Sequence, residues 1–270
     1  LSPSNLLPDA GRSQEPVSRL VDAKLEYLLR QGDNALILSQ QLCKLCGKGP
    51  ALEEDMALAN VALDLLGQTR MWLTYAAELE GLGRSEDHLA YLRDAHQMRC
   101  CLIVEQPNGD YGFTLMRQFL FDSWHYFLMH GLTKSSDTRI AEIAEKSLKE
   151  VTYHLRRSGD LVVRLGDGTL DSRQRMQAAL DALWMYSGEM FIYDDIDNQM
   201  VAQGVAPDAA GLRDAFLEHV SEIFAEATLA MPPADAWMQQ GGKAGRHSEH
   251  LGYILAEMQF LQRAYPGADW

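Results

Sequence analysis

The stretch Leu58–Leu79, LANVALDLLGQTRMWLTYAAEL, decides the fold. Its apolar side chains recur at the spacing of one face of an α-helix, and further leucines lie on the other faces. A helix that is apolar nearly all round is expected in the middle of a helical bundle, with neighbours on several sides. The residues on its main apolar face are Leu58, Val61, Leu65, Trp72 and Leu79.

A short polar row interrupts this helix. Asn60, Asp64 and Gln68 follow one another at intervals of four residues, so they lie on one side of the helix. A carboxylate inside a bundle is costly to desolvate unless another group pairs with it. Asp64 is therefore expected to have a specific polar partner.

The rest of the chain predicts an all-α protein. Glycine, proline and capping residues divide the first part into two helical hairpins that are joined by a long crossover. One long crossover between antiparallel pairs is the connectivity of a ferritin-like four-helix bundle. The predicted bundle helices are 17–46, with a local break at Gly32-Asp33, then 52–81, 111–132 and 138–165, and a further helix at 86–104 lies in the crossover.

The predicted domain organisation is simple. Residues 1–16 contain three prolines and are expected to form a flexible arm, and residues 17–270 are expected to form a single ferritin-like domain. Its core bundle spans about 17–166. Additional C-terminal helices, within about 169–270, are expected near 172–187, 208–229 and 247–262, and the segment 230–246 is expected to be irregular.

Composition excludes several classes of function. The 38 acidic residues outnumber the 24 lysines and arginines, and a formal charge of −14 argues against a nucleic-acid-binding surface. No apolar run is long enough for a transmembrane helix, and residues 1–16 do not resemble a signal peptide. Four cysteines are too few for a disulfide scaffold, so a reducing cytoplasm is expected. Cys43 and Cys46 have CxxC spacing, but their leucine-rich helical surroundings favour a structural role over redox chemistry or zinc binding.

A ferritin-like di-iron centre needs six ligands from four helices: a Glu from each of two helices and a Glu-x-x-His pair from each of the other two. The sequence satisfies this pattern poorly. Gly67 stands three positions after Asp64. His154 follows Glu150 by four positions, about 100° further round the helix than a ligand three positions on, and cannot simply replace it. The candidate ligand positions are Asp33, Asp64, Asp122, His125 and Glu150.

We interpret these positions as the remnant of a metal site. Asp64, Asp122 and His125 are expected to form a buried polar network with Asn60, Gln68 and Gln118, and no metal or catalytic residue is expected in this chain.

Two further motifs carry weaker signals. His247 and His250 have HxxH spacing at the start of a helix, but no further ligands are identified, and a helix start facing solvent or a partner is favoured. The run Gly241–Arg246, GGKAGR, has the composition of a phosphate-contacting loop before a helix N-terminus. It follows no strand and lacks the P-loop pattern, which favours an ordinary loop.

Four stretches resemble the C subunits of bacterial phenylacetyl-CoA epoxidases, also called phenylacetate-CoA oxygenase structural subunits. They are ALANVALDLLGQTR (57–70), VEQPNGD (104–110), KEVTYHLRRSGD (149–160) and GGKAGRHSEHLGYILAEMQFLQR (241–263). The resemblance covers about residues 24–270, and residues 1–20 depart from the pattern.

The resemblance implies a structural chain that pairs with a homologous catalytic subunit. That partner holds the di-iron centre, a separate reductase delivers electrons from NADPH, and the complex forms the ring 1,2-epoxide of phenylacetyl-CoA in aerobic phenylacetate degradation. No ligand set of the family can be transferred to this chain. Lys243, Arg246 and His247 are candidates for contact with CoA or a partner.

Two alternatives remain open. The chain could itself be a di-iron oxygenase or ferroxidase that uses the candidate positions above, or it could be a helical interaction module with no oxygenase partner.

Overall fold

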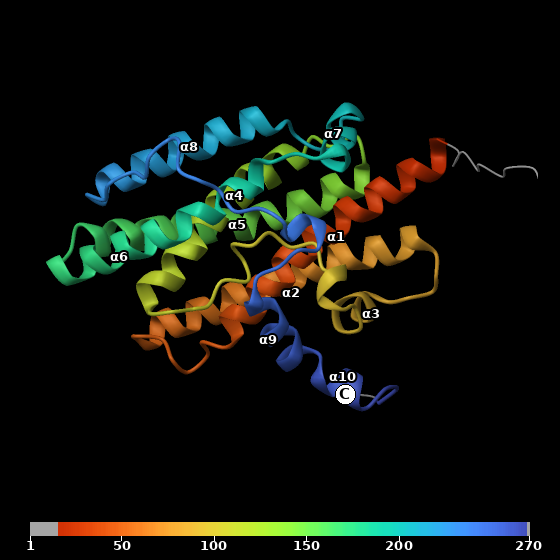
Figure 1. Cartoon of the computed structure of the whole chain (residues 1–270), viewed down its shortest axis with the longest axis horizontal. Helices are drawn as coiled ribbons and strands as arrows, with labels where there is room; N and C mark the ends of the chain where they lie inside the picture. Colours follow the sequence, from red (N-terminus) through yellow and green to blue (C-terminus); the bar gives the residue numbers. More distant parts are fainter. Residues whose placement is uncertain (1–15, 269–270) are drawn as a thin grey trace, which may run out of the picture.

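The protein is described by a computed structural model that covers residues 16–268. Within that range every regular element is a helix, and the core is a ferritin-like four-helix bundle (Figure 1). In the same residues, no helix combines the length and apolar content needed to cross a lipid bilayer. Residues 1–15 of the predicted arm lie outside the described part of the chain.

Two antiparallel hairpins build the bundle. The first pairs α1 (Pro16–Cys43) with α2 (Leu52–Glu80), and the second pairs α4 (Tyr111–Leu132) with α5 (Thr138–Gly166). Local chemistry fixes the ends of these helices. Gly81 ends α2 in the left-handed conformation, with φ of 69°, and the Asp110 side chain caps α4 by accepting a hydrogen bond from the Phe113 amide. The predicted helices 52–81, 111–132 and 138–165 are confirmed.

Helix α2 lies at an edge of the bundle, so its predicted central position is wrong. Leu63 is 64% exposed and Leu66 is 41% exposed, whereas Leu58, Val61 and Trp72 are buried. The helix packs chiefly on α1 and makes fewer contacts with α3 and α5. Helix α2 therefore carries apolar residues on all sides without having neighbouring helices on all sides.

The predicted break at Gly32-Asp33 is also wrong, because α1 continues through it to Cys43. A Cβ atom on Gly32 would lie 2.5 Å from Cδ2 of Leu73 on α2. The glycine therefore allows the two helices to approach closely. It does not end a helix.

The crossover contains less helix than predicted. Only α3 (Glu86–Tyr91) and the 3₁₀ turn η1 (Ala95–Gln97) are helical within the predicted 86–104 helix. Residues 98–106 are mostly buried, and side chains from other elements bond to their backbone. Asn34 accepts from the Cys101 amide at 2.7 Å, and Gln41 donates to the Gln106 carbonyl at 2.7 Å. These tertiary hydrogen bonds satisfy the backbone in place of a helical ladder.

The C-terminal third packs on the bundle. Helices α6 (Leu170–Leu183) and α8 (Ala209–Glu226) cover α4 and α5, α7 (Asp195–Ala202) packs on α1, and α9 (Glu249–Met258) packs on α1 and η1. The predicted last helix ends early, and α10 (Phe260–Ala264) follows it. Figure 1 shows α9 and α10 on the side of the bundle opposite α8.

The sequence analysis missed α7. It is short and polar, and Asp194 begins it by accepting hydrogen bonds from the Ile196 and Asp197 amides. The segment 230–246 is irregular as predicted, apart from the 3₁₀ turn η4 (Gly242–Ala244) within it. Two further 3₁₀ turns, η2 (Trp184–Tyr186) and η3 (Gly188–Phe191), lie between α6 and α7.

Candidate functional site

A polar centre lies where α2 faces α5. The Asp64 carboxylate is 2.9 Å from Nε2 of His154, and Nε2 of Gln68 donates to Glu150 Oε2 at 2.9 Å. The His154 side chain is fully buried, whereas the Asp64 side chain is 36% exposed. Asp64 thus has the specific partner that its position requires.

This arrangement corrects one expectation about register. Glu150 and His154 both reach α2, where His154 pairs with Asp64, because residues four apart lie on one helix face. Gly67 is exposed, and nothing would lie within 4 Å of a Cβ atom added to it. Any side chain at Gly67 would therefore point to the surface, while Gln68 points inward.

Asp122 of α4 is the most deeply buried carboxylate of the centre. It accepts hydrogen bonds from Gln118 Nε2 at 2.6 Å and from the Ser158 hydroxyl at 2.9 Å. Burial raises the pKa of Asp122 to about 6, although His154 and the two hydrogen bonds act in the opposite direction. Its proton equilibrium therefore lies close to neutral pH.

His125, one turn further along α4, is neutral. Burial, with a smaller contribution from the charge of His154, lowers the pKa of His125 to about 3. Its ring lies among aromatic side chains, with centroids 5.0 Å from Phe121 and 6.1 Å from Trp124. Nδ1 of His125 is buried and has no hydrogen-bond partner in the described part of the chain, and Asn60, which was expected in the same network, is exposed.

Asp33 does not join this centre. Its two oxygens face the guanidinium of Arg93 in the crossover, and Oδ2 also accepts from the Arg99 amide at 2.7 Å. Both side chains of the Asp33–Arg93 pair are buried. Helix α1 therefore directs this carboxylate toward the crossover and supplies none of the candidate ligands at the centre.

The donors of the centre do not fit a di-iron site. They are three carboxylates and two imidazoles where six ligands are needed, and each carboxylate oxygen named above is bound to an amide, a hydroxyl or His154. In residues 16–268, no three ligand atoms of this centre lie within 4.8 Å of one another. The hydrogen bonds of this centre can hold α5 against α2 and α4.

The buried carboxyl of Asp122 predicts a measurable pH dependence. Its folded-state pKa of about 6 lies above its unfolded value, so the folded protein binds more protons between pH 4 and pH 6. Stability from this group is present at about pH 3, below the unfolded pKa, and is lost as the pH rises through 6, by about 3 kcal/mol. Asp122→Asn cannot ionise. Urea unfolding should therefore show the variant gaining about 3 kcal/mol relative to wild type between pH 3 and pH 7.

The exposed Asp214→Asn on α8 is the control, and its difference from wild type should stay constant over the same range. A constant difference for Asp122→Asn as well would show that the pKa of Asp122 is not raised.

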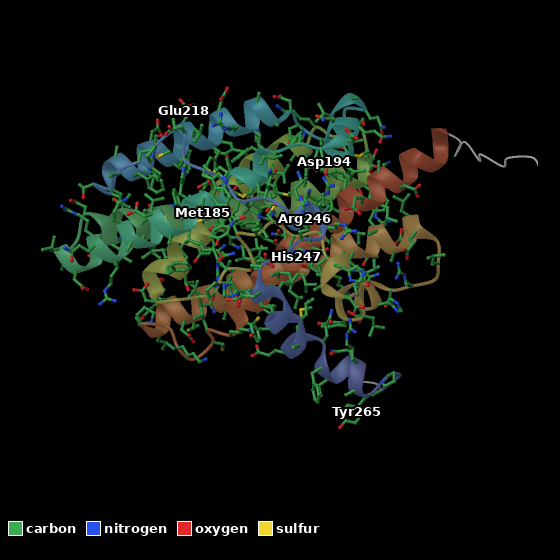
Figure 2. The ribbon with its side chains drawn as sticks, viewed as in Figure 1. Met185, Asp194, Glu218, Arg246, His247 and Tyr265 are labelled. Carbon is green, nitrogen blue, oxygen red and sulfur yellow. The ribbon has the colours of Figure 1, made fainter. Side chains whose placement is uncertain are left out.

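The three candidate CoA or partner contacts have different surroundings. The ammonium of Lys243 pairs with the Asp197 carboxylate and donates to the Ile192 carbonyl at 2.8 Å. His247 is largely buried. Arg246 is exposed, and its side chain has no polar partner in the described part of the chain. Figure 2 shows Arg246 and His247 close together where the irregular segment meets α9.

The sequence analysis missed the network that holds Lys243. Arg30 of α1 contacts Asp194 and Asp197, at 2.6 and 2.9 Å, and Asp197 also contacts Lys243. The interaction with Arg30 lowers the pKa of Asp194 to about 2 against the effect of burial. A signal was present in the sequence, because DDID at 194–197 offers a capping residue followed by an inward carboxylate.

Comparison with known proteins gives two findings. The family model described as "Phenylacetic acid catabolic protein" matches residues 12–270. The chain is also similar to the C subunit of the 1,2-phenylacetyl-CoA epoxidase of Escherichia coli (strain K12), with 49% identity over 244 residues. The similarity covers 90% of this chain and 98% of the relative.

Proposed function

Because the chain belongs to the family of phenylacetic acid catabolic proteins, we propose that it is a structural, non-catalytic C subunit of a phenylacetyl-CoA 1,2-epoxidase. In this proposal a homologous partner subunit holds the di-iron centre and a reductase supplies electrons. The predicted compartment is the cytoplasm. The similarity to an epoxidase C subunit over nearly its whole length supports the assignment to such a complex.

One observation carries the non-catalytic role. The carboxylates at three of the candidate ligand positions bind His154 or neighbouring amide and hydroxyl groups: Asp64 with His154, Glu150 with Gln68, and Asp122 with Gln118 and Ser158. A carboxylate whose oxygens already accept such bonds must give them up before it can bind iron. Asp33, the carboxylate expected from α1, is held by Arg93.

The proposed role of the centre is mechanical. Each of its hydrogen bonds between different helices joins α5 to α2 or α4, and helices at the edge of a bundle need such fixed contacts to present a constant surface to a partner. Three residues are candidates for contact with CoA or a partner, and such contact is proposed only for Arg246. Lys243 and His247 are engaged inside the protein.

The test is the turnover of the reconstituted epoxidase with Asp64→Asn/Asp122→Asn in this chain. Asparagine keeps the shape of aspartate and an oxygen that can accept hydrogen bonds, but it is a poor ligand for iron. We expect turnover of phenylacetyl-CoA within about twofold of wild type, because no transition-state contact is removed.

The matched control is the same change at a ligand carboxylate of the partner subunit, which should abolish turnover. If the variant of this chain folds and assembles but turnover is lost, the alternative holds, in which this chain is itself a di-iron oxygenase.

A further inference from the structure

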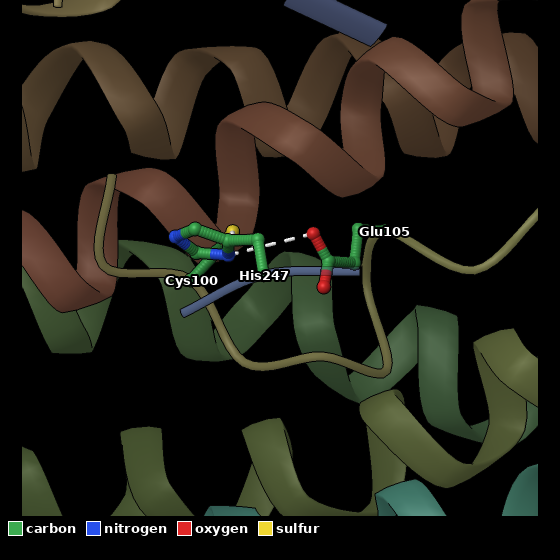
Figure 3. Close-up of side chains that lie close together, drawn as sticks. All are labelled: Cys100, Glu105 and His247. Carbon is green, nitrogen blue, oxygen red and sulfur yellow. Dashed lines mark hydrogen bonds and ion pairs between the residues drawn. The ribbon is translucent and has the colours of Figure 1, made fainter. Parts of the chain in front are cut away.

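Three side chains that no motif connects meet where the crossover touches the segment before α9. Cys100 and Glu105 come from the buried crossover, and His247 lies two residues before α9 (Figure 3). Nδ1 of His247 is 3.4 Å from Glu105 Oε2 and 4.0 Å from Cys100 Sγ, and the three ligand atoms all lie within 4.8 Å of one another. This is the one such group of His, Cys, Asp or Glu in residues 16–268.

The Glu105 carboxylate has one satisfied oxygen and one free oxygen. Oε1 accepts a hydrogen bond from the Ser248 amide at 2.9 Å. Oε2 is buried and has no hydrogen-bond partner within residues 16–268, and it is the oxygen that faces His247. The Glu105 side chain is fully buried, so this oxygen cannot be satisfied by bulk water. A buried anionic oxygen of this kind needs a positive partner.

The orientation of His247 identifies the atom that faces the free oxygen. Nε2 lies 3.0 Å from the Met98 carbonyl, which can only accept, so Nε2 carries a hydrogen. In the neutral ring, Nδ1 then presents its lone pair to Oε2 of Glu105 and to Cys100. Two lone pairs facing each other in a buried site repel, so a proton or a metal ion must lie between them.

We propose that Cys100, Glu105 and His247 bind one divalent transition-metal ion of the zinc class. A thiolate, an imidazole nitrogen and a carboxylate oxygen are a ligand set that zinc accepts and that magnesium and calcium do not prefer. A tetrahedral zinc ion with bonds of about 2.0–2.3 Å places neighbouring ligand atoms about 3.3–3.6 Å apart. The two separations from His247 Nδ1, 3.4 Å to Glu105 Oε2 and 4.0 Å to Cys100 Sγ, need a shift of only a few tenths of an ångström. The third separation, between Cys100 and Glu105, lies within 4.8 Å and must shorten to the same range when the ion binds.

The surrounding contacts suit a metal site. Metal-binding histidines commonly donate their other N–H to a backbone carbonyl, as His247 does to Met98, and the Ser248 amide holds the second oxygen of the carboxylate. Binding displaces the Cys100 thiol proton, and any proton on Nδ1, into solvent. The chain supplies three ligands, and a bound water molecule would complete the tetrahedral set. Because the ligands come from two segments, the ion fastens the start of α9 to the crossover.

The test uses the full-length, reduced chain with Cys43→Ala and Cys46→Ala, which remove the exposed CxxC pair as a competing site. Zn²⁺ is titrated calorimetrically, and Co²⁺ is titrated with absorption spectroscopy. We expect one equivalent of either ion to bind, a thiolate-to-cobalt charge-transfer band, and a higher unfolding temperature with zinc. Binding is measured on the isolated chain, so its failure would leave the proposed epoxidase role untouched.

Matched variants locate the site. Cys100→Ala should remove the charge-transfer band, and His247→Ala should weaken binding at least tenfold. Cys101→Ala and His250→Ala, which change neighbouring residues of the same types, should leave both unchanged. The proposal is overturned if no stoichiometric binding occurs, if the cobalt complex has no thiolate band, or if Cys101→Ala removes that band. The cobalt spectrum of the chain that keeps all three ligands shows whether a thiolate binds the ion, even where a variant does not fold.

Discussion

Asp33→Ala is expected to lower the free energy of unfolding by about 3–5 kcal/mol. The change leaves the guanidinium of Arg93 buried without a carboxylate and the Arg99 amide without its acceptor. Removing one partner of a buried ion pair is costly because the remaining charge is still desolvated. Urea unfolding followed by circular dichroism measures the loss.

The control is Asp94→Ala, which removes an ion pair with Arg263 whose partners are both exposed. Exposed pairs contribute little, so we expect a loss of less than about 1 kcal/mol. Equal losses for the two variants would mean that the Asp33–Arg93 pair does not hold the crossover on α1.

Glu189→Ala is expected to lower the free energy of unfolding by about 3 kcal/mol. The buried carboxylate accepts from the Leu102 amide and the Gly241 amide, each at 2.7 Å, so it joins the crossover to the segment before α9. The variant leaves two buried N–H groups without acceptors, and each costs about 1–3 kcal/mol. Urea unfolding measures the total, and faster amide hydrogen exchange at Leu102 and Gly241 would locate it.

Glu218→Ala is the matched control, because Glu218 lies on the outer side of α8 (Figure 2), away from the crossover. Its stability should equal that of wild type. If exchange at Leu102 and Gly241 is unchanged in Glu189→Ala, the carboxylate does not anchor this segment.

The sequence pattern predicted those bundle helices whose ends are set by residues close by in the chain. Apolar periodicity, together with glycine, proline and capping residues, locates three of the four bundle helices to within a residue. Gly32 shows the limit of this reasoning. Its role depends on Leu73, a residue on another helix, and periodicity along one helix carries no information about such an approach.

The prediction for the crossover failed for a related reason. Residues 98–106 continue the apolar pattern of the predicted helix, but Asn34 and Gln41 on α1 and Glu189 on η3 satisfy their backbone instead. Tertiary hydrogen bonds of this kind override local helix propensity. No local pattern marks the three side chains as partners of the crossover.

At the candidate site, the sequence indicated that Asp64 needs a partner but did not identify it. The structure supplies His154, which reaches across from α5. The spacing of residues along one helix does not reveal which side chain of another helix lies opposite Asp64. The same limit explains why Asp33 was grouped with Asp64 and Asp122, although it faces the crossover.

The most direct test of the proposed structural role is the iron content of this chain. The chain is co-expressed with the partner subunit, the two are separated, and iron in each is measured by mass spectrometry. Cys100→Ala is measured in parallel so that the Cys100, Glu105 and His247 cluster adds no metal. We predict that the iron remains with the partner and that this chain carries far less than one atom. Two iron atoms per chain with a di-ferric absorption band would contradict the account.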